Sequence, residues 1–382
     1  MRGNLVRSVA ILLAHAAVAL AACSLAAERA RAQQSSDTTR TIERKAMPAE
    51  SEKNVDIYQT RAGRLQAKPL DWSVTIGKPT PPSAPSEPQS NNANIQGSTS
   101  EGGLPNPRAN LDAQRMHPND WPGLRRNPAA NRHGMLDQGP LGGDIQLTAG
   151  SPDIFTQYGE YAPAVNADAP AAVGKLFTAA GTCTASVISG KNAIVTAAHC
   201  CWDRSKNNWI GGWAFSPAYD NGNAPYGTFN WSTATVLTSW VNNGDVPSDV
   251  CVIKLQNDRA GRGVTYYTGW LGRSWDWGSD QEHHALGYPG NIGNANALEL
   301  CTSESFSPSS SCGGSGVLNM GCSMTFGSSG GPWVRHYRSD NWVNAVVHGY
   351  DSQSCTGTFG ATFNGPRFTS GNIVVVCNAA GC

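Results

Sequence analysis

The chain has 382 residues with 28 basic and 28 acidic side chains, so its formal net charge is zero. Within residues 151–382, 11 Lys and Arg residues stand against 15 Asp and Glu residues. This stretch lacks the excess positive charge that nucleic-acid binders direct at phosphates, and we expect no nucleic-acid partner.

Residues 1–32 have the features of an export signal. Arg2 and Arg7 precede an apolar run over 9–22, and Ala30-Arg31-Ala32 fits an A-x-A cleavage site. An alternative stays open at Cys23, because Leu20-Ala21-Ala22-Cys23 resembles a bacterial lipobox, which would lipidate this cysteine and tether the chain. The sequence predicts a secreted or periplasmic protein with no membrane partner unless Cys23 is lipidated.

Residues 33–150 show little hydrophobic periodicity. The segment 78–88 is rich in proline, and a stretch rich in Asn, Gly and Ser follows it. Such a composition buries too little apolar surface to offset the entropy of ordering, so we expect a low-complexity, disordered region. Two roles fit it: a propeptide that masks the active site or assists folding, and a linker.

Residues 151–382 are the expected folded domain. Short apolar or alternating runs recur between Gly, Asn, Ser and Pro, and no helix-length periodic segment stands out, which predicts an all-β domain. The expected strands lie at Ala185–Ser189, Ala193–Ala198, Thr233–Trp240, Val250–Leu255, Trp333–Tyr337, Val343–His348 and Asn372–Cys377.

Ten of the 11 cysteines lie at or after residue 183. An even set of this kind fits five disulfides formed in an oxidising compartment. Metal binding is disfavoured because no C-x-x-C pair occurs, Cys200 and Cys201 are adjacent, and His283 and His284 would point to opposite faces of a strand. We expect no metal and no cofactor.

Three side chains suit acyl transfer by a serine. His199 ends an apolar run and would be the general base, and Ser329, in a glycine-rich turn, would be the nucleophile. Asp249 precedes a run of buried character and would orient the base, whereas Asp245 is expected to be solvated. Taken alone, His199 could be a structural histidine, Asp249 a turn residue, and the glycine-rich segment around Ser329 a flexible linker. Their order along the chain favours catalysis.

The run Gly327-Ser328-Ser329-Gly330-Gly331-Pro332 has the composition of a nucleophile loop. Glycines let the backbone turn tightly and approach a substrate closely. The amides of Gly327 and Ser329 are the expected oxyanion hole.

Thr196-Ala197-Ala198-His199-Cys200, Asp249 and the Gly327–Pro332 run, in this order, resemble the chymotrypsin/trypsin-like serine peptidases. Gly287-Tyr288-Pro289 and Cys322–Gly327 are similar to a secreted microbial branch related to the V8-like glutamyl endopeptidases. The resemblance implies two antiparallel six-stranded β-barrels with the active site in the cleft between them. It further implies a monomeric, secreted serine endopeptidase that acts on proteins or peptides.

The resemblance also implies two disulfides, Cys183–Cys200 and Cys301–Cys322, and leaves the other six cysteines unassigned. Two functional alternatives stay open. One is a catalytically inactive homologue that serves as a binding or adhesion module, and the other is an esterase that uses the same three residues.

The chain departs from animal trypsins at two positions. Ser328 stands where they carry the Asp that pairs with a newly cut N-terminus, and Ser323 stands where they carry the Asp that selects Arg or Lys. Ser323, Thr325 and His348 are the expected substrate pocket. In glutamyl endopeptidases a histidine near the position of His348 helps to bind an acidic side chain, which is one hypothesis here. The alternative is a strand histidine satisfied by backbone groups.

Overall fold

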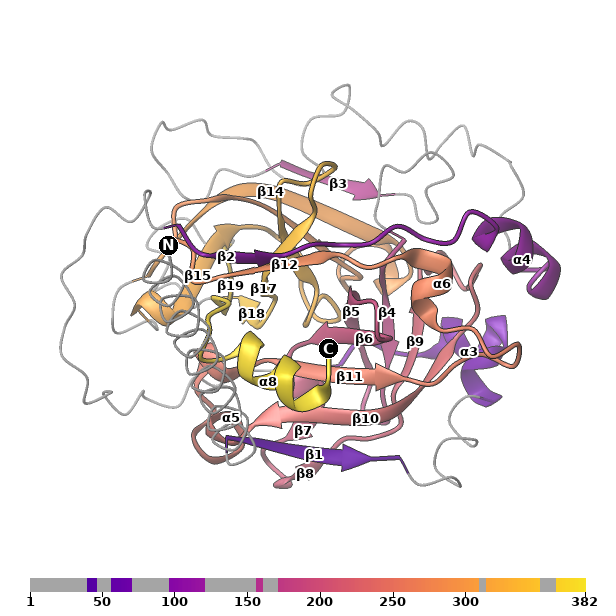
Figure 1. Ribbon diagram of the computed structural model, residues 1–382, viewed down its shortest axis with the longest axis horizontal. Coiled ribbons are helices and arrows are strands. Elements are labelled where there is room, and N and C mark those ends of the chain that lie inside the picture. The colour runs from indigo at the N-terminus through magenta and orange to yellow at the C-terminus, as the bar shows by residue number, and fades with distance from the viewer. Residues whose placement is uncertain are drawn as a thin grey trace, which may run out of the picture.

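The computed structural model describes residues 40–46, 56–70, 96–120, 156–160, 171–308, 314–350 and 362–382. The expected export signal, Cys23 and the proline-rich segment 78–88 lie outside these ranges. Two β-units make up most of the described chain, and helices are few (Figure 1).

Six antiparallel strands form the first unit: β4 (Val173–Phe177), β5 (Thr182–Ser189), β6 (Ala193–Thr196), β9 (Ala214–Pro217), β10 (Phe229–Leu237) and β11 (Cys251–Leu255). They follow the order β10, β11, β6, β5, β4, β9, and β9 pairs back onto β10, so the barrel is closed. The first expected barrel is therefore confirmed. Its core includes the indoles of Trp213 and Trp231, which meet edge to face with centroids 4.6 Å apart.

The second unit is a sheet of ten strands: β2 (Ser98–Ser100), β3 (Thr156–Glu160), β12 (Gly272–Trp275), β13 (Glu282–Gly287), β14 (Leu298–Phe306), β15 (Val317–Gly321), β16 (Pro332–Arg335), β17 (Trp342–Val346), β18 (Gly349–Tyr350) and β19 (Thr362–Pro366). Six of these strands close into the second expected barrel in the order β13, β14, β15, β19, β17, β16, because β17 meets β19 at the antiparallel bridge between Ala345 and Arg367 and β16 pairs with β13. The sheet takes up β2 and β3 from earlier parts of the chain, and β12 pairs with β17 in parallel.

The helices are α3 (Arg61–Gln66), α4 (Ala109–Met116), α5 (Thr238–Asn243), α6 (Val264–Thr268) and α8 (Ile373–Ala380), with 3-10 turns η3 (Ala198–Cys200), η4 (Val246–Ser248), η5 (Gly293–Ala295) and η7 (Gly314–Gly316). The strands β7 (Trp202–Asp203) and β8 (Asn208–Trp209) pair as a separate two-stranded antiparallel ribbon. Over the described ranges, no helix is long and apolar enough to span a membrane.

The expected strand over 372–377 is wrong, because α8 occupies this segment. The Asn372 side chain caps the first turn by accepting the Ile373 amide at 2.5 Å, and Gly381 ends the helix with a left-handed φ of 72°. The helix packs on β10 and β11 (Figure 1). Local capping and this contact therefore outweigh the strand preference of the β-branched Ile-Val-Val-Val run.

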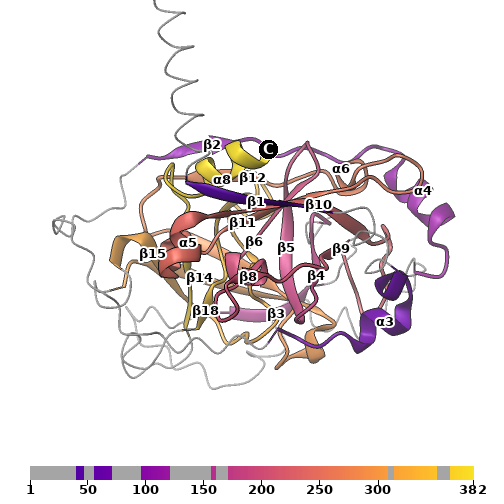
Figure 2. The ribbon, with the colours of Figure 1, turned by 90° about the horizontal axis from the view of Figure 1, so that it is seen from below.

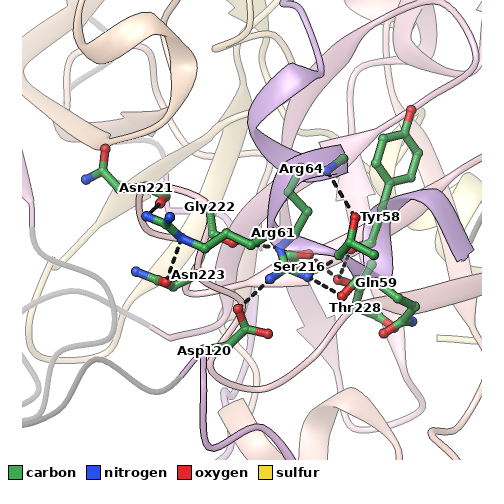
Figure 3. A network of polar contacts seen from close by, with 12 residues as sticks. Tyr58, Gln59, Arg61, Arg64, Asp120, Ser216, Asn221, Gly222, Asn223 and Thr228 are labelled. Atoms are coloured by element: carbon green, nitrogen blue, oxygen red, sulfur yellow. Dashed lines mark hydrogen bonds and ion pairs between the residues drawn. The ribbon is translucent and has the colours of Figure 1, made fainter.

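The expected disorder of residues 33–150 is wrong for three described stretches. The strand β1 (Thr41–Lys45) extends the barrel sheet at β10, and β2 pairs with β12 (Figure 2). Helix α3 is held by Arg64, whose buried guanidinium donates to the Gly222 carbonyl at 2.8 Å and pairs with Asp120 at 2.5 Å (Figure 3). These stretches form part of the folded body.

Candidate active site

His199 is positioned by the end of a fully buried strand. All four residues of β6 are buried, and the chain turns directly into η3, which carries the imidazole. The Cys183–Cys200 disulfide joins this turn to β5, as the family resemblance implied. His199 itself has no exposed surface.

Asp249 lies between η4 and β11 and is fully buried. Its Oδ1 accepts the backbone N–H of His199 at 2.8 Å, and its Oδ2 lies 2.7 Å from His199 Nδ1. Burial by itself would raise the pKa of Asp249, but the charges and hydrogen bonds of His199 and His348 outweigh it and hold the pKa below its usual range. The rival Asp245 is exposed, and its carboxylate accepts from the Asn243 side chain at 3.2 Å.

A second disulfide, which the sequence analysis left unassigned, joins the two halves of this pair. Cys201 bonds to Cys251. The first cysteine follows His199 by two residues and the second follows Asp249 by two, so the bond cross-links the base-bearing turn to the acid-bearing strand. This shared spacing was a signal from which the pairing could have been inferred.

The nucleophile loop approaches this pair from the second unit. Thr184 of β5 donates its amide to the Ser329 carbonyl at 2.8 Å and its hydroxyl to the Gly327 carbonyl at 2.9 Å. The Cys200 sulfur lies 3.8 Å from the same Ser329 carbonyl oxygen. The structure thus brings the backbone of Ser329 next to the residue that follows His199.

Two glycines of the loop are required by geometry. Gly330 has a φ of 79°, and a Cβ there would lie 1.9 Å from Thr196 Oγ1. Gly327 has a φ of 96°, and a Cβ there would lie 2.5 Å from the Tyr288 carbonyl oxygen. Only glycine combines this backbone conformation with such close approach.

The amides of the loop divide into two groups. Those of Ser328, Gly330 and Gly331 donate to backbone carbonyls, whereas those of Gly327 and Ser329 donate no hydrogen bond within the described part of the chain. Ser328 is buried, and its hydroxyl donates to the Thr325 carbonyl at 2.6 Å. Ser328 therefore closes the loop locally, at the position where animal trypsins carry an ion-pairing Asp.

The expected pocket residues make two sets of contacts. Ser323 and Thr325 are half-buried on the segment before the nucleophile, and Asn291 holds both by accepting the Thr325 amide at 3.1 Å and donating to the Ser323 carbonyl at 2.9 Å. The Cys301–Cys322 disulfide anchors the start of this segment, as the resemblance implied. His348 instead contacts Asp249, its Nδ1 lying 2.5 Å from Oδ2. This contact was not predicted from the sequence.

His199, Asp249 and His348 bring three possible metal-ligand atoms within 4.8 Å of one another. Both imidazole Nδ1 atoms face the same carboxylate oxygen at hydrogen-bond distance, so these three atoms are paired with one another. Elsewhere, His283 is buried between Ser305 and Asn344 while His284 stacks on Tyr337, in keeping with opposite faces of one strand.

Four further cysteines were left unassigned by the sequence. Cys377 bonds to Cys382 at the end of α8, whereas Cys312 and Cys355 lie outside the described residues.

No protein-family model and no curated protein matches the chain. Among solved structures, protease Anisep from Arthrobacter nicotinovorans is 25% identical at a TM-score of 0.50, over 59% of this chain and 99% of that protein. The thermostable serine protease AL20 from an extremophilic microorganism is 25% identical at a TM-score of 0.49, over 55% of this chain and 97% of its own. A Glu endopeptidase in complex with MPD is 16% identical at a TM-score of 0.45, over 56% of this chain and 92% of its own. The two β-barrels, and the likeness to protease Anisep, show that this chain has the chymotrypsin-like fold of serine proteases.

Proposed function

We propose that this chain is a secreted serine endopeptidase that hydrolyses peptide bonds through an acyl-enzyme. The observation that carries the proposal is the buried carboxylate of Asp249, which holds both the backbone amide and Nδ1 of His199. An ionised carboxylate only accepts hydrogen bonds, so Nδ1 bears the proton and Nε2 keeps its lone pair. His199 in this tautomer takes the proton of Ser329 as the hydroxyl attacks, and returns it to the leaving amine.

The oxyanion of the tetrahedral intermediate would be bound by the amides of Gly327 and Ser329. Their lack of hydrogen bonds to the described residues supports this role, because donors must be free when negative charge develops. The fixed loop conformation around them means that little reorganisation is needed during the reaction.

Labelling with a fluorophosphonate probe tests the proposal against the two alternatives. We expect the mature wild-type chain to be labelled and Ser329→Ala to remain unlabelled. Equal labelling of the two chains would refute the assigned nucleophile, and labelling without cleavage of any protein or peptide would favour the esterase. An intact chain that is neither labelled nor hydrolytic would favour the binding or adhesion module.

The residues proposed for the substrate pocket are Ser323, Thr325 and His348. The hydroxyl-bearing segment that contains Ser323 and Thr325 is pinned by Asn291, which supports a fixed pocket wall. Recognition of an acidic side chain by His348 stays a prediction. Paired peptides that differ only by Glu or Gln at the cleaved residue test it, and equal turnover of the two would exclude it.

We also propose that residues 33–150 act as a propeptide and not as a simple linker. Thr182 donates to the Lys68 carbonyl at 2.8 Å and accepts the Leu70 amide at 2.9 Å, two residues before the Thr184 that binds the nucleophile loop. A Cβ on Gly327 would lie 3.4 Å from Pro69 Cβ, so this segment lies against the expected oxyanion hole. Both contacts support masking of the site before maturation.

N-terminal sequencing of the exported protein, together with probe labelling of the full chain, tests the propeptide. We expect a processed N-terminus, and faster labelling once Leu70→Asp disturbs the docked segment. The same substitution at Leu104, which is 91% exposed, is the matched control. Full labelling of the unprocessed wild type would leave the linker as the better explanation. Secretion itself is supported by the four disulfides among the described residues.

A further inference from the structure

Asp249 is shared by two imidazoles. His348 Nδ1 and His199 Nδ1 lie 2.5 and 2.7 Å from the same oxygen, Oδ2, while Oδ1 accepts the His199 amide. The two rings stand edge to face, with centroids 5.6 Å apart. All three side chains are buried, so the carboxylate has three N–H donors in place of water.

His348 differs from a purely structural histidine of the same chain. Both ring nitrogens of His283 are hydrogen-bonded, one to Ser305 and the other to Asn344. His348 Nε2 is buried and has no hydrogen-bond partner among the described residues, so Asp249 is the one side chain there that binds this ring. The imidazole is held by the carboxylate and not by a separate polar network.

We propose that His348 is a positioning residue for the reaction, with its Nδ1–H fixing the carboxylate of Asp249 in the orientation that serves His199. The inference rests on the proposed peptidase function. When His199 takes the serine proton, positive charge develops beside Asp249, and a carboxylate held by three donors does not need to reorient. The His348 Nδ1–H also shares Oδ2 as an acceptor, so the negative charge of this oxygen interacts less strongly with His199 than it would without His348.

Among the described residues, His199 and His348 are the ionisable side chains that bind Asp249. From α5, the indole of Trp240 faces both rings, with centroids 6.5 and 6.1 Å away, and Arg204 lies over that indole at 5.8 Å. From β19, the contact is the neutral backbone carbonyl of Asn364. The pH dependence of the site should therefore respond directly to a change at His348.

Three substitutions at His348 distinguish the effect of the Nδ1–H donor from the effect of side-chain volume. His348→Asn keeps an N–H near the Nδ1 position, His348→Gln moves it toward the Nε2 position, and His348→Leu removes it. For His348→Leu we expect kcat per titrated active site to fall by roughly 10- to 100-fold, which corresponds to one hydrogen bond to a buried charge. His348→Asn should recover most of this loss, and His348→Gln should not.

The acidic limb of the pH profile of kcat/KM supplies a readout that a merely structural role would not move. Without the His348 donor, Oδ2 binds the proton-bearing His199 more strongly, so the limb moves to higher pH in His348→Leu and stays in place in His348→Asn. A leucine variant with wild-type kcat and an unchanged limb would overturn the proposal. Loss of labelling specificity for Ser329 would instead overturn the proposed function.

If the leucine variant does not fold, nuclear magnetic resonance of the histidine-labelled Ser329→Ala chain decides. We expect two imidazole Nδ1–H protons bound to a carboxylate, one of which disappears in His348→Asn. A single such proton in the parent chain refutes the shared carboxylate. Stoichiometric binding of added Zn²⁺ that removes both signals would also refute it and assign the three side chains to a metal.

Discussion

Lys175 should destabilise the barrel at neutral pH. This residue of β4 is fully buried, its Nζ lies 3.2 Å from Asn296 Oδ1 and 4.7 Å from the centroid of the Tyr219 ring, and no carboxylate pairs with it among the described residues. Burial lowers the pKa of Lys175 to about 7. We expect Lys175→Met to stabilise the protein near pH 7.

The magnitude follows from proton linkage. An unfolded chain holds its lysine protons up to a pH of about 10.4, and each tenfold change in proton affinity is worth about 1.4 kcal/mol, so the charged form costs about 4 to 5 kcal/mol below pH 7. Between pH 7 and 10 the unfolded chain binds more protons than the folded one, and stability therefore rises with pH. From pH 7 to pH 9 the gain for Lys175 is about 2 kcal/mol.

Urea unfolding at pH 7 and pH 9 measures this effect, in a Ser329→Ala background that prevents self-cleavage. The Tyr219 hydroxyl still donates to Asn296 Oδ1 at 2.6 Å after the substitution, so methionine leaves that acceptor satisfied. We expect the rise between pH 7 and pH 9 to be lost in Lys175→Met and retained in Lys191→Met, a control at an exposed lysine. The same rise in all three chains would refute the reasoning.

Three more predictions concern the active site. Asp249→Asn should lower kcat by roughly 10⁴-fold with peptide substrates. Because folding lowers the pKa of Asp249, its ionised carboxylate stabilises the wild type above a pH of about 4. Acid unfolding curves should show that this stabilisation is lost as pH falls in the wild type and is absent from Asp249→Asn. Gly330→Ala should cost about 3 kcal/mol or more in thermal or urea unfolding, whereas Gly261→Ala, with a φ of 76° and no neighbour within 4 Å, should cost about 1 kcal/mol. Replacing both Cys201 and Cys251 by serine should cost about 4 kcal/mol in the same assay for a loop that spans 50 residues, and an unchanged midpoint would contradict it.

The sequence was sufficient where chemistry and local pattern agree. The apolar run before His199 became β6, and the glycines around Ser329 proved necessary at positive φ. The sequence led to wrong or missing predictions where tertiary contacts determine the structure. Strand β1 is largely polar and adds to β10 through backbone hydrogen bonds, which leave little hydrophobic periodicity to detect. The contact of His348 with Asp249 joins residues 99 apart, and no local pattern encodes it.

The two halves of the site are held by different means. Cys200 bonds to Cys183 in β5 and Cys201 to Cys251 in β11, and these strands flank β6 on both sides. The turn that bears His199 is thus cross-linked to both neighbours, and Asp249 enters one of them.

No disulfide among the described residues links the nucleophile loop to the barrel. Among the described contacts, Ser329 is tied to the barrel by the Thr184 amide and to the second unit by its own loop, in which Gly330 donates to Val347. The His199–Asp249 pair should therefore persist when the second unit loosens, while the position of Ser329 depends on the docking of the two units. Conditions that weaken this docking should abolish probe labelling before they break the hydrogen bonds of Asp249.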